Sequence, residues 1–232
     1  MRSAHRDTVH AATDARAPAG ARAVAARPTR DALRTKASIL AAATHEFARH
    51  GLSGARVDRI ADRAKTNKRM LYYYFGRKEA LFLAVLERAY ENIRAEEQNL
   101  RLLELAPARG VEQLIVFTWN YFLAHPEFMS LLNTENLHRA RHLKKSKKVL
   151  AMHSPLLATL DELLKRGVRE GVFRRGVDPV QLYVSIAALG YFYISNNHTL
   201  STIFGRDLLA PAAKEARIAH AVEFTLGYLA RN

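Results

Sequence analysis

Residues 60–82 read IADRAKTNKRMLYYYFGRKEALF, and this stretch decides the fold. Its pattern predicts two short helices joined by a tight turn, with apolar residues along one side of the second helix. The other side of that helix carries cations, an amide and phenols: Asn67, Lys68, Arg69, Tyr72 and Tyr73, with Lys78 just beyond. A short helix with such a face suits the major groove of DNA. The stretch therefore favours a protein that reads DNA over a catalyst.

Helical patterns surround this motif on both sides. Before it, Leu33 and Phe47 fall on one face of a helix over about 30–50, with Thr29 as the expected N-cap and Gly51 as the expected left-handed end. Further helices are expected at about 56–63, 67–73, 78–98, 110–125, 127–138, 149–170, 178–199 and 211–230. Strand signals are nearly absent, and the short segment 171–176 reads as a turn between helices. The sequence therefore predicts an all-α protein.

Composition narrows the class further. The chain has 232 residues, of which 49% are hydrophobic, so it is long enough to bury a sizeable core. No apolar run approaches the ~20 residues of a membrane span. The chain has no cysteine, which excludes disulfides and thiolate metal sites. We expect a cytoplasmic protein without a cofactor.

Positive charge is concentrated near the DNA-reading motif. The formal net charge is +14; residues 1–81 hold 17 Lys and Arg against 7 Asp and Glu, and residues 82–232 hold 19 against 15. Such a field attracts a polyanion. Residues 1–29 are rich in Ala and Arg and poor in large apolar residues, so we expect a disordered basic arm. A wrongly assigned start codon is the alternative explanation of this segment.

The stretch from about 33 to 82 resembles the N-terminal DNA-binding domain of the TetR/AcrR family of bacterial regulators. The matching residues are Ile39, Leu40, Phe47 and Gly51, then Val57, Ile60, Ala61 and Ala64, and finally Leu71 to Phe75 and Lys78 to Leu81. The resemblance implies a three-helix domain over residues 30–77 that contains a helix-turn-helix. It also implies a C-terminal helical domain over 78–232 that binds a ligand and forms a dimer.

Two positions depart from the family pattern. The family usually has Gly in the turn after the second helix, where this chain has Lys65. A lysine there either strains a left-handed turn by ~1 kcal/mol or adds a phosphate contact. The family often has Thr before the second helix, where this chain has Ala55 and Arg56. Arg56 lacks a hydroxyl cap but adds a cation near the DNA backbone.

The residues of the motif divide into two roles, because phosphate contacts fix the register and base-edge contacts give specificity. By resemblance, Arg56, Tyr73 and Lys78 contact the backbone. Lys68 and Arg69 are the candidates for reading bases, since Arg can donate a fork of hydrogen bonds to guanine. For Asn67 we favour capping of the helix over base reading.

Specificity requires two copies of this unit. A pair related by a two-fold axis reads a palindrome whose half-sites lie about 34–36 Å apart or a multiple of that. The segment 178–199 is apolar nearly all round, which predicts burial on both sides. On the segment 211–230 the expected interface is the stripe Ile218, Val222, Leu226 and Leu229. The resemblance likewise assigns the last two helices to a four-helix dimer interface.

A ligand pocket is expected in the C-terminal helices, where aromatic residues and amides occur together. The candidate wall residues are Trp119, Phe122, Phe128, Asn133, Tyr183, Tyr191 and Asn197. Plain core packing is the alternative for each aromatic residue. Asn133 and Asn136 lie where we expect partial burial, and buried amides need partners.

Catalytic and metal-binding patterns lack support. His138 and His142 are four residues apart, which suits a metal on one helix face, but the surrounding basic run repels cations. No nucleophile triad, carboxylate pair or phosphate-binding loop stands out. The sequence therefore predicts a ligand-responsive transcriptional regulator, a repressor that binds a palindromic DNA operator as a homodimer. A small molecule is expected to release it from the operator. The alternatives are a DNA-binding regulatory or architectural protein without an effector, and an all-helical enzyme.

Overall fold

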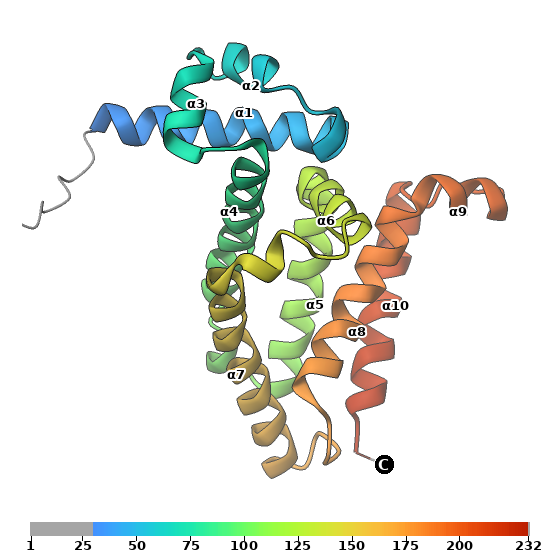
Figure 1. Ribbon diagram of the computed structural model, residues 1–232. Coiled ribbons are helices and arrows are strands. Elements are labelled where there is room, and N and C mark those ends of the chain that lie inside the picture. Colours follow the sequence, from blue (N-terminus) through green and yellow to red (C-terminus); the bar gives the residue numbers. More distant parts are fainter. Residues whose placement is uncertain (1–29, 232) are drawn as a thin grey trace, which may run out of the picture.

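The structure is a computed structural model that describes residues 30–231. In this part of the chain every regular element is a helix (Figure 1). The α-helices are α1 Arg30–Gly54, α2 Val57–Arg63, α3 Lys68–Phe75, α4 Lys78–Gln98, α5 Pro107–Ala124, α6 Pro126–Leu137, α7 Lys147–Arg169, α8 Pro179–Ser195, α9 Asn197–Phe204 and α10 Pro211–Leu229. Two short 3-10 helices, η1 Leu102–Glu104 and η2 Leu143–Lys145, lie in the connections. The all-α prediction is confirmed.

The helices form two stacked parts, with α1 to α3 at one end and α5, α7, α8 and α10 in a bundle beneath (Figure 1). Helix α4 leaves the small unit and runs down into the bundle beside α7. Helix α6 lies under α1 and packs against it. Motion in the bundle can therefore reach the small unit through α4 and α6.

Separate apolar cores stabilise the two parts. Phe47 of α1, Ile60 of α2, Leu71 of α3 and Phe82 of α4 are buried together, and Leu131 of α6 completes this core. The bundle has a core that joins α5, α7, α8 and α10, and a smaller cluster links α4, α5 and α6. Since α6 contributes to the core of the small unit, the two parts are in direct contact.

Most helix boundaries agree with the sequence expectation within three residues. Helix α1 passes beyond Gly51, which has a φ of 62°, as a kink before the last turn. The prediction of a single helix over 178–199 was wrong at its C-terminal end. Helix α8 ends at Ser195, and α9 turns away from it (Figure 1). The side-chain amide of Asn196 donates to the carbonyl of Phe192 at 2.9 Å, a local bond that competes with helix continuation.

The connection after α7 is a turn, as expected, with one isolated antiparallel bridge between Phe173 and Ala230. The expected cap Thr29 and the expected basic arm lie outside the described residues. No helix among residues 30–231 is long and apolar enough to cross a membrane.

Candidate nucleic-acid interface and ligand cavity

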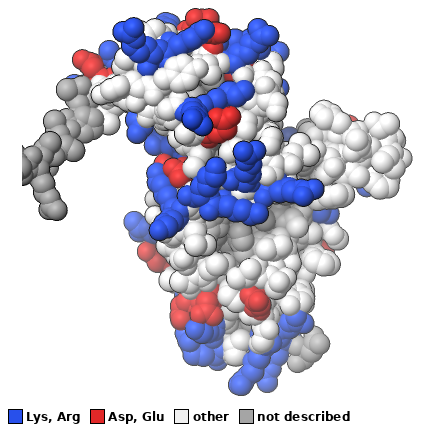
Figure 2. Space-filling model, in the orientation of Figure 1, with Lys and Arg blue, Asp and Glu red and all other residues white. Residues whose placement is uncertain are grey.

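The outward side of α2 and α3 is basic. Figure 2 shows Lys and Arg side chains gathered at the end of the molecule that these helices form. All candidate contact residues in this unit are exposed except Lys78, which is half-buried; the exposed ones are Arg56, Lys65, Asn67, Lys68, Arg69, Tyr72 and Tyr73. Leu71 of α3 is buried in the core beneath. The core therefore fixes which side of α3 is presented outward.

The turn between α2 and α3 is tightly bonded. The N–H of Thr66 donates to the carbonyl of Ala61 at 3.0 Å, and the N–H of Lys65 donates to that of Asp62 at 3.1 Å. This is the bonding of a Schellman motif, in which a left-handed residue, usually Gly, ends the helix. Lys65 occupies that position with a φ of 51°. Asn67 then caps α3 by accepting from the N–H of Met70 at 3.1 Å, the role we favoured over base reading.

Replacing Lys65 with Gly should separate the effect of its left-handed backbone on stability from the effect of its charge on DNA binding. We expect a gain in stability of about 0.5 kcal/mol, since Gly removes a left-handed penalty of roughly 1–2 kcal/mol but adds chain entropy to the unfolded state. DNA binding should weaken on all sequences, with a salt dependence reduced by about one ion. Lys65→Ala is the matched control, because it removes the charge and keeps the left-handed strain. Thermal unfolding that ranks Lys65→Ala at or above Lys65→Gly would contradict this account.

Several cations on this surface already have partners in the chain. Lys68 forms an ion pair with Asp58 of α2, and the ammonium of Lys78 donates to the carbonyl of Ala55 at 3.2 Å. For Arg69 the described residues provide no ion pair or hydrogen bond. Arg69 is therefore the candidate base reader that needs to break no bond within the protein before it contacts DNA.

Sequence reasoning missed a buried carboxylate that positions α2. Glu46 of α1 accepts from the backbone N–H of Arg56 at 3.0 Å, and it lies 3.5 Å from the guanidinium of Arg59. Its side chain is only 6% exposed. This bond fixes the N-cap residue of α2 to α1, but it does not replace a hydroxyl cap, which would accept from an N–H inside the first turn of α2. The available signal was its position beside Phe47 on the inward side of α1.

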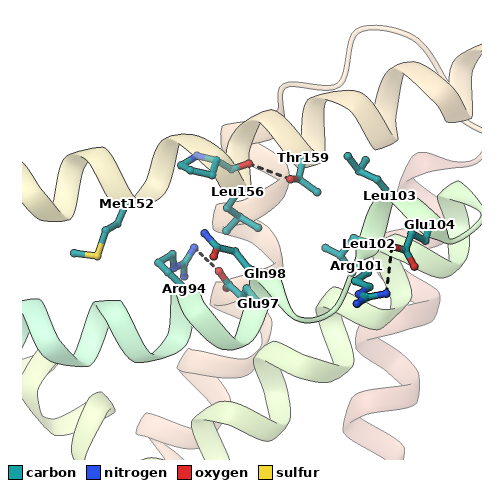
Figure 3. A pocket seen from close by; sticks show the side chains of 11 residues that line it. Arg94, Glu97, Gln98, Arg101, Leu102, Leu103, Glu104, Met152, Leu156 and Thr159 are labelled. Atoms are coloured by element: carbon teal, nitrogen blue, oxygen red, sulfur yellow. Dashed lines mark hydrogen bonds and ion pairs between the residues drawn. The ribbon is translucent and has the colours of Figure 1, made fainter.

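A cavity of about 240 Å³ lies between α4 and α7 (Figure 3). Arg94 and Glu97 of α4 line one side, Met152 and Leu156 of α7 line the other, and η1 closes one end. None of the seven residues that we expected in a pocket wall lines it.

Arg94 and Glu97 form a buried ion pair in this cavity. The Nη1 of Arg94 lies 2.8 Å from the Oε2 of Glu97, and the Nη2 of Arg94 donates to the hydroxyl of Tyr183 at 2.7 Å. The Nη1–Oε2 contact is an ion pair without the geometry of a hydrogen bond. Burial raises the pKa of Glu97 to about 7, and the nearby Arg94 opposes that rise.

The expected pocket residues lie elsewhere. Trp119, Phe122 and Phe128 are buried in the bundle, with Trp119 against Tyr193 at a ring distance of 5.6 Å. Tyr183 reaches the cavity only through its bond to Arg94.

The amides do not occupy the partly buried environment that we expected. Asn133 is exposed, where its amide donates to the hydroxyl of Ser195 at 3.1 Å and its carbonyl accepts from Tyr191. Asn136 is also exposed. Asn197 donates to the carbonyl of Ile194 at 2.7 Å, a bond that belongs to the break between α8 and α9. Asn133 and Asn197 therefore bond groups at the C-terminal end of α8 and not in the cavity, so polar residues alone were a poor guide to it.

The residues that sequence reasoning missed, Arg94 and Glu97, lie on α4, the helix expected over 78–98. Glu97 lies four residues after Ile93, which lies seven after Leu86, so these three share one face of α4. All three are buried. A carboxylate in line with an inward stripe was the signal that could have found the site.

The expected interface stripe on α10 faces inward. Leu229 is fully buried within the chain, and Ile218, Val222 and Leu226 pack half-buried against the same core. Another set of large apolar residues is exposed on α8, α9 and α10: Val180, Val184, Phe192, Ile203, Phe204, Phe224 and Tyr228. An exposed apolar set of this size on adjoining helices is typical of an interface.

The His138 and His142 pair belongs to the packing of α6. The backbone N–H and Nδ1 of His142 both lie 2.7 Å from oxygens of the buried Glu135. No group of three or more metal-ligating side chains occurs within residues 30–231.

Comparisons with known proteins agree with this geometry. Residues 39–85 match the family model described as bacterial regulatory proteins, tetR family, and residues 107–225 match the model described as tetracyclin repressor-like, C-terminal domain. The HTH-type transcriptional repressor NicS of Pseudomonas putida is 41% identical over 181 residues, which cover 78% of this chain and 85% of that protein. The HTH-type transcriptional repressor SCO4008 of Streptomyces coelicolor is 41% identical over 113 residues, or 47% and 53% of the two chains.

Solved structures show the same fold. The regulator SCO4942 of Streptomyces coelicolor superposes with a TM-score of 0.64 at 28% identity and covers 85% of this chain and 99% of its own. A TetR family transcription regulator from Marinobacter aquaeolei superposes with a TM-score of 0.65 at 19% identity, covering 88% and 99%.

Proposed function

The chain belongs to the TetR family of bacterial transcriptional regulators, and from this premise we propose that it is a dimeric repressor which a small molecule releases from a palindromic operator. The main support for this proposal is the exposed side of α3. Arg69 and Tyr72 are exposed there, while Leu71 on the opposite side is buried in the core. The relatives NicS and SCO4008 are both named repressors, which supports repression over activation. A cytoplasmic location follows from this role.

In this proposal the domain boundary lies at Arg77, the N-cap residue of α4. Residues 30–77 bind DNA, and residues 78–232 bind the effector and the partner. The phosphate contacts come from Arg56, Lys65, Tyr73 and Lys78, and Arg69 reads bases. Lys68 reads bases as well only if its ion pair with Asp58 breaks. Asn67 orders the start of α3 as its cap.

The proposed dimer places the exposed apolar residues of α8 and α10 against the same residues of a second copy. A two-fold axis makes the patch self-complementary, which is the common arrangement of homodimers. Burial of Phe192, Phe224 and Tyr228 in this way removes their apolar surface from water. The expected stripe Ile218, Val222, Leu226 and Leu229 then supports the interface from behind.

Ligand binding in the cavity between α4 and α7 is the proposed switch. Helix α4 begins directly after the DNA-binding unit and contributes Arg94 and Glu97 near its other end. A ligand that binds one position of α4 better than another changes the spacing of the two α3 helices in the dimer. A coupling of about 1–3 kcal/mol is typical, and operator DNA must weaken the ligand by the same factor.

Two other functions predict different results in DNA-binding experiments. A regulatory or architectural protein without an effector would bind DNA with an affinity that no small molecule changes. The cavity between α4 and α7 favours an effector instead. The family places the chain among regulators, and an enzyme would lack sequence-specific DNA binding.

Arg69→Ala tests the reading of bases by α3. We expect a loss of about 1–3 kcal/mol on the cognate operator and a relaxed preference at one base pair. Lys78→Ala is the comparison, since loss of a phosphate contact weakens all duplexes alike and lowers the salt slope by about one. Binding titrations on cognate and random duplexes at several salt concentrations measure both effects. Equal losses on the two duplexes for Arg69→Ala would remove Arg69 from base reading.

A further inference from the structure

A second basic surface lies outside the three-helix unit, in the connection between α6 and α7. Figure 2 shows a band of Lys and Arg side chains across the middle of this face, at the height where Figure 1 draws the connection. Residues 139–148 read RARHLKKSKK and contain no Asp or Glu. The cations of this segment are all exposed, and we call them the connection patch: Arg139, Arg141, Lys144, Lys145, Lys147 and Lys148.

Most of the charge in the connection patch is uncompensated. Lys148 forms an ion pair with Glu91 of α4. The side chains of the other five cations have no ion pair or hydrogen bond within residues 30–231. Lys147 and Lys148 also stand in the first turn of α7, which has no acidic residue, although the N-terminal end of a helix is itself positive. Like charges gathered in this way attract a polyanion.

The backbone under the patch is held in a fixed shape. Arg139 and Ala140 have φ values of 55° and 56°, in the left-handed region that residues other than glycine rarely adopt. The buried Glu135 accepts from two backbone N–H groups of the connection at 2.7 and 2.9 Å, and the hydroxyl of Ser146 donates to Glu87 of α4 at 2.6 Å. Backbone of this kind persists where its surroundings determine it, and it clusters at functional sites.

A groove of about 810 Å³ joins the connection patch to the DNA-binding unit. Arg77 and Lys78 at the start of α4 line it together with Arg141 and Lys145 of the patch. Glu79 is the one carboxylate among its lining residues. The positive surface therefore continues from the start of α4 into the C-terminal domain.

Duplex DNA is the polyanion that this position fits. In the function proposed above, Lys78 contacts a phosphate of the operator. A duplex carries one charge per ~1.7 Å of its axis, so further phosphates adjoin that one. Because Arg141 and Lys145 line the same groove as Lys78, they are placed to contact these neighbouring phosphates.

The composition of the patch favours a duplex over a single strand. Proteins hold single-stranded nucleic acids by stacking the bases on exposed aromatic side chains. The one ring among residues 139–148 is the imidazole of His142, which is buried and bonded to Glu135. Lys and Arg side chains without such rings suit phosphate contacts, which position the DNA and carry no sequence information.

We propose that the connection patch is a second DNA-binding surface of this chain, in which Arg141 and Lys145 hold phosphates next to the one bound by Lys78. The proposal rests on the DNA-binding function proposed above, and it places part of the DNA contact in the C-terminal domain. These contacts add to affinity and to its salt dependence and leave the preferred sequence unchanged.

The double variant Arg141→Gln with Lys145→Gln tests this contact. A dimer would lose four phosphate contacts, each worth roughly 0.9 in the slope of log affinity against log salt, so the slope should fall by roughly 3–4. At about 0.15 M salt we expect affinity to fall about tenfold or more, on cognate and random duplexes alike. Both side chains are exposed, so thermal unfolding should match the wild type.

Lys165→Gln with Arg175→Gln is the matched control. It also removes one lysine and one arginine at exposed positions, in the last turns of α7 and in the segment after it. Lys165 lies roughly 27 Å from Lys147 along the helix. The control should keep the salt slope and the DNA affinity of the wild type.

Ethylation interference locates the contact on the DNA. Lys78→Ala identifies the phosphate bound by Lys78, because ethylation of that phosphate no longer weakens this variant. Ethylation of the adjoining phosphates should weaken binding by the wild type and by the control. It should have no effect on the double variant.

Each outcome bears on the proposal. It is overturned if the double variant keeps the salt slope and interference pattern of the wild type, or if the control loses as much affinity as the double variant. Normal DNA binding by the double variant, with weaker binding of free tripolyphosphate than the wild type shows, would assign the groove to a free anion and overturn it as well.

The proposed function fails separately. A wild-type protein that prefers no operator over random DNA would refute that function. A lower salt slope of the double variant on random duplexes would still support the connection patch.

Discussion

Replacing Phe224 with Glu is expected to split the dimer and to lower operator affinity by about 10³-fold or more, toward the level of non-specific binding. Phe224 lies on α10 with 58% of its surface exposed in the single chain. In the proposed dimer this ring is covered by the partner, so a carboxylate there would be buried without a counter-charge. Each monomer then reads one half-site only.

Two features of α10 make Phe224 the best position for this test. It lies on the outward side of the helix, one turn before Tyr228, while the neighbouring Thr225 and Leu229 are buried in the chain's own core. A Cβ built on Gly227, between these two turns, would meet no atom within 4 Å, so this side of α10 is open in the single chain. A change at Phe224 therefore leaves the fold of the monomer unaffected.

Sedimentation velocity at micromolar concentration measures the assembly, and DNA titrations measure the operator affinity. Leu150→Glu is the matched control, because Leu150 is also a large exposed apolar residue, on α7 and outside the proposed interface. It should leave both the dimer and DNA binding unchanged. A dimeric Phe224→Glu protein with normal operator affinity would move the interface to another surface.

Replacing Glu135 with Ala is expected to lower the stability of the protein by about 3–5 kcal/mol, which is roughly 6–20 °C in melting temperature for a chain of this size. Glu135 is buried on α6 and accepts from the backbone N–H groups of His142 and Leu143 at 2.7 and 2.9 Å. Its other oxygen lies 2.7 Å from Nδ1 of His142. Alanine would leave these groups buried without partners.

This carboxylate also connects the bundle to the DNA-binding unit. The ring of His142 packs edge-on against Phe82 at 5.1 Å, and Leu143 packs against the same core as Phe82. Because Leu131 of α6 is buried in that core as well, loss of Glu135 loosens the support under α1 and α4. Operator affinity should therefore fall along with stability.

Thermal and urea unfolding measure the effect of Glu135→Ala. Glu127→Ala is the matched control: Glu127 lies on the same helix and also faces a histidine, His125 at 3.2 Å, but its side chain is 40% exposed. An exposed pair of this kind contributes at most about 1 kcal/mol. Unfolding of Glu135→Ala no earlier than Glu127→Ala would contradict the structural role of the buried carboxylate.

The sequence predicted the local structure of α2 and α3 well because its signals are local. Apolar spacing, the cap at Asn67 and the left-handed residue at Lys65 all act within a few residues. The break at Asn196 was missed because side chains there compete for carbonyls of a helix that is otherwise strongly apolar.

The cavity could not be predicted in the same way. It depends on how α4 packs against α7, and that contact joins residues about 60 positions apart in the sequence, such as Arg94 and Leu156. Aromatic residues were a poor guide, since Trp119 and Phe122 fill the core of the bundle instead. The inward stripe on α10 was likewise predicted as an interface, because periodicity identifies a buried face and not what buries it.

Selection of binding sites from random duplex DNA, followed by footprinting of the wild-type protein, tests the central claim most directly. A dimer that presents two copies of α3 should select an inverted repeat, protect both half-sites equally and place their centres about 34–36 Å apart or a multiple of that. Substitution of one half-site should reduce affinity as strongly as substitution of the other. Recovery of a single asymmetric site, or of no preferred sequence at all, would contradict the account.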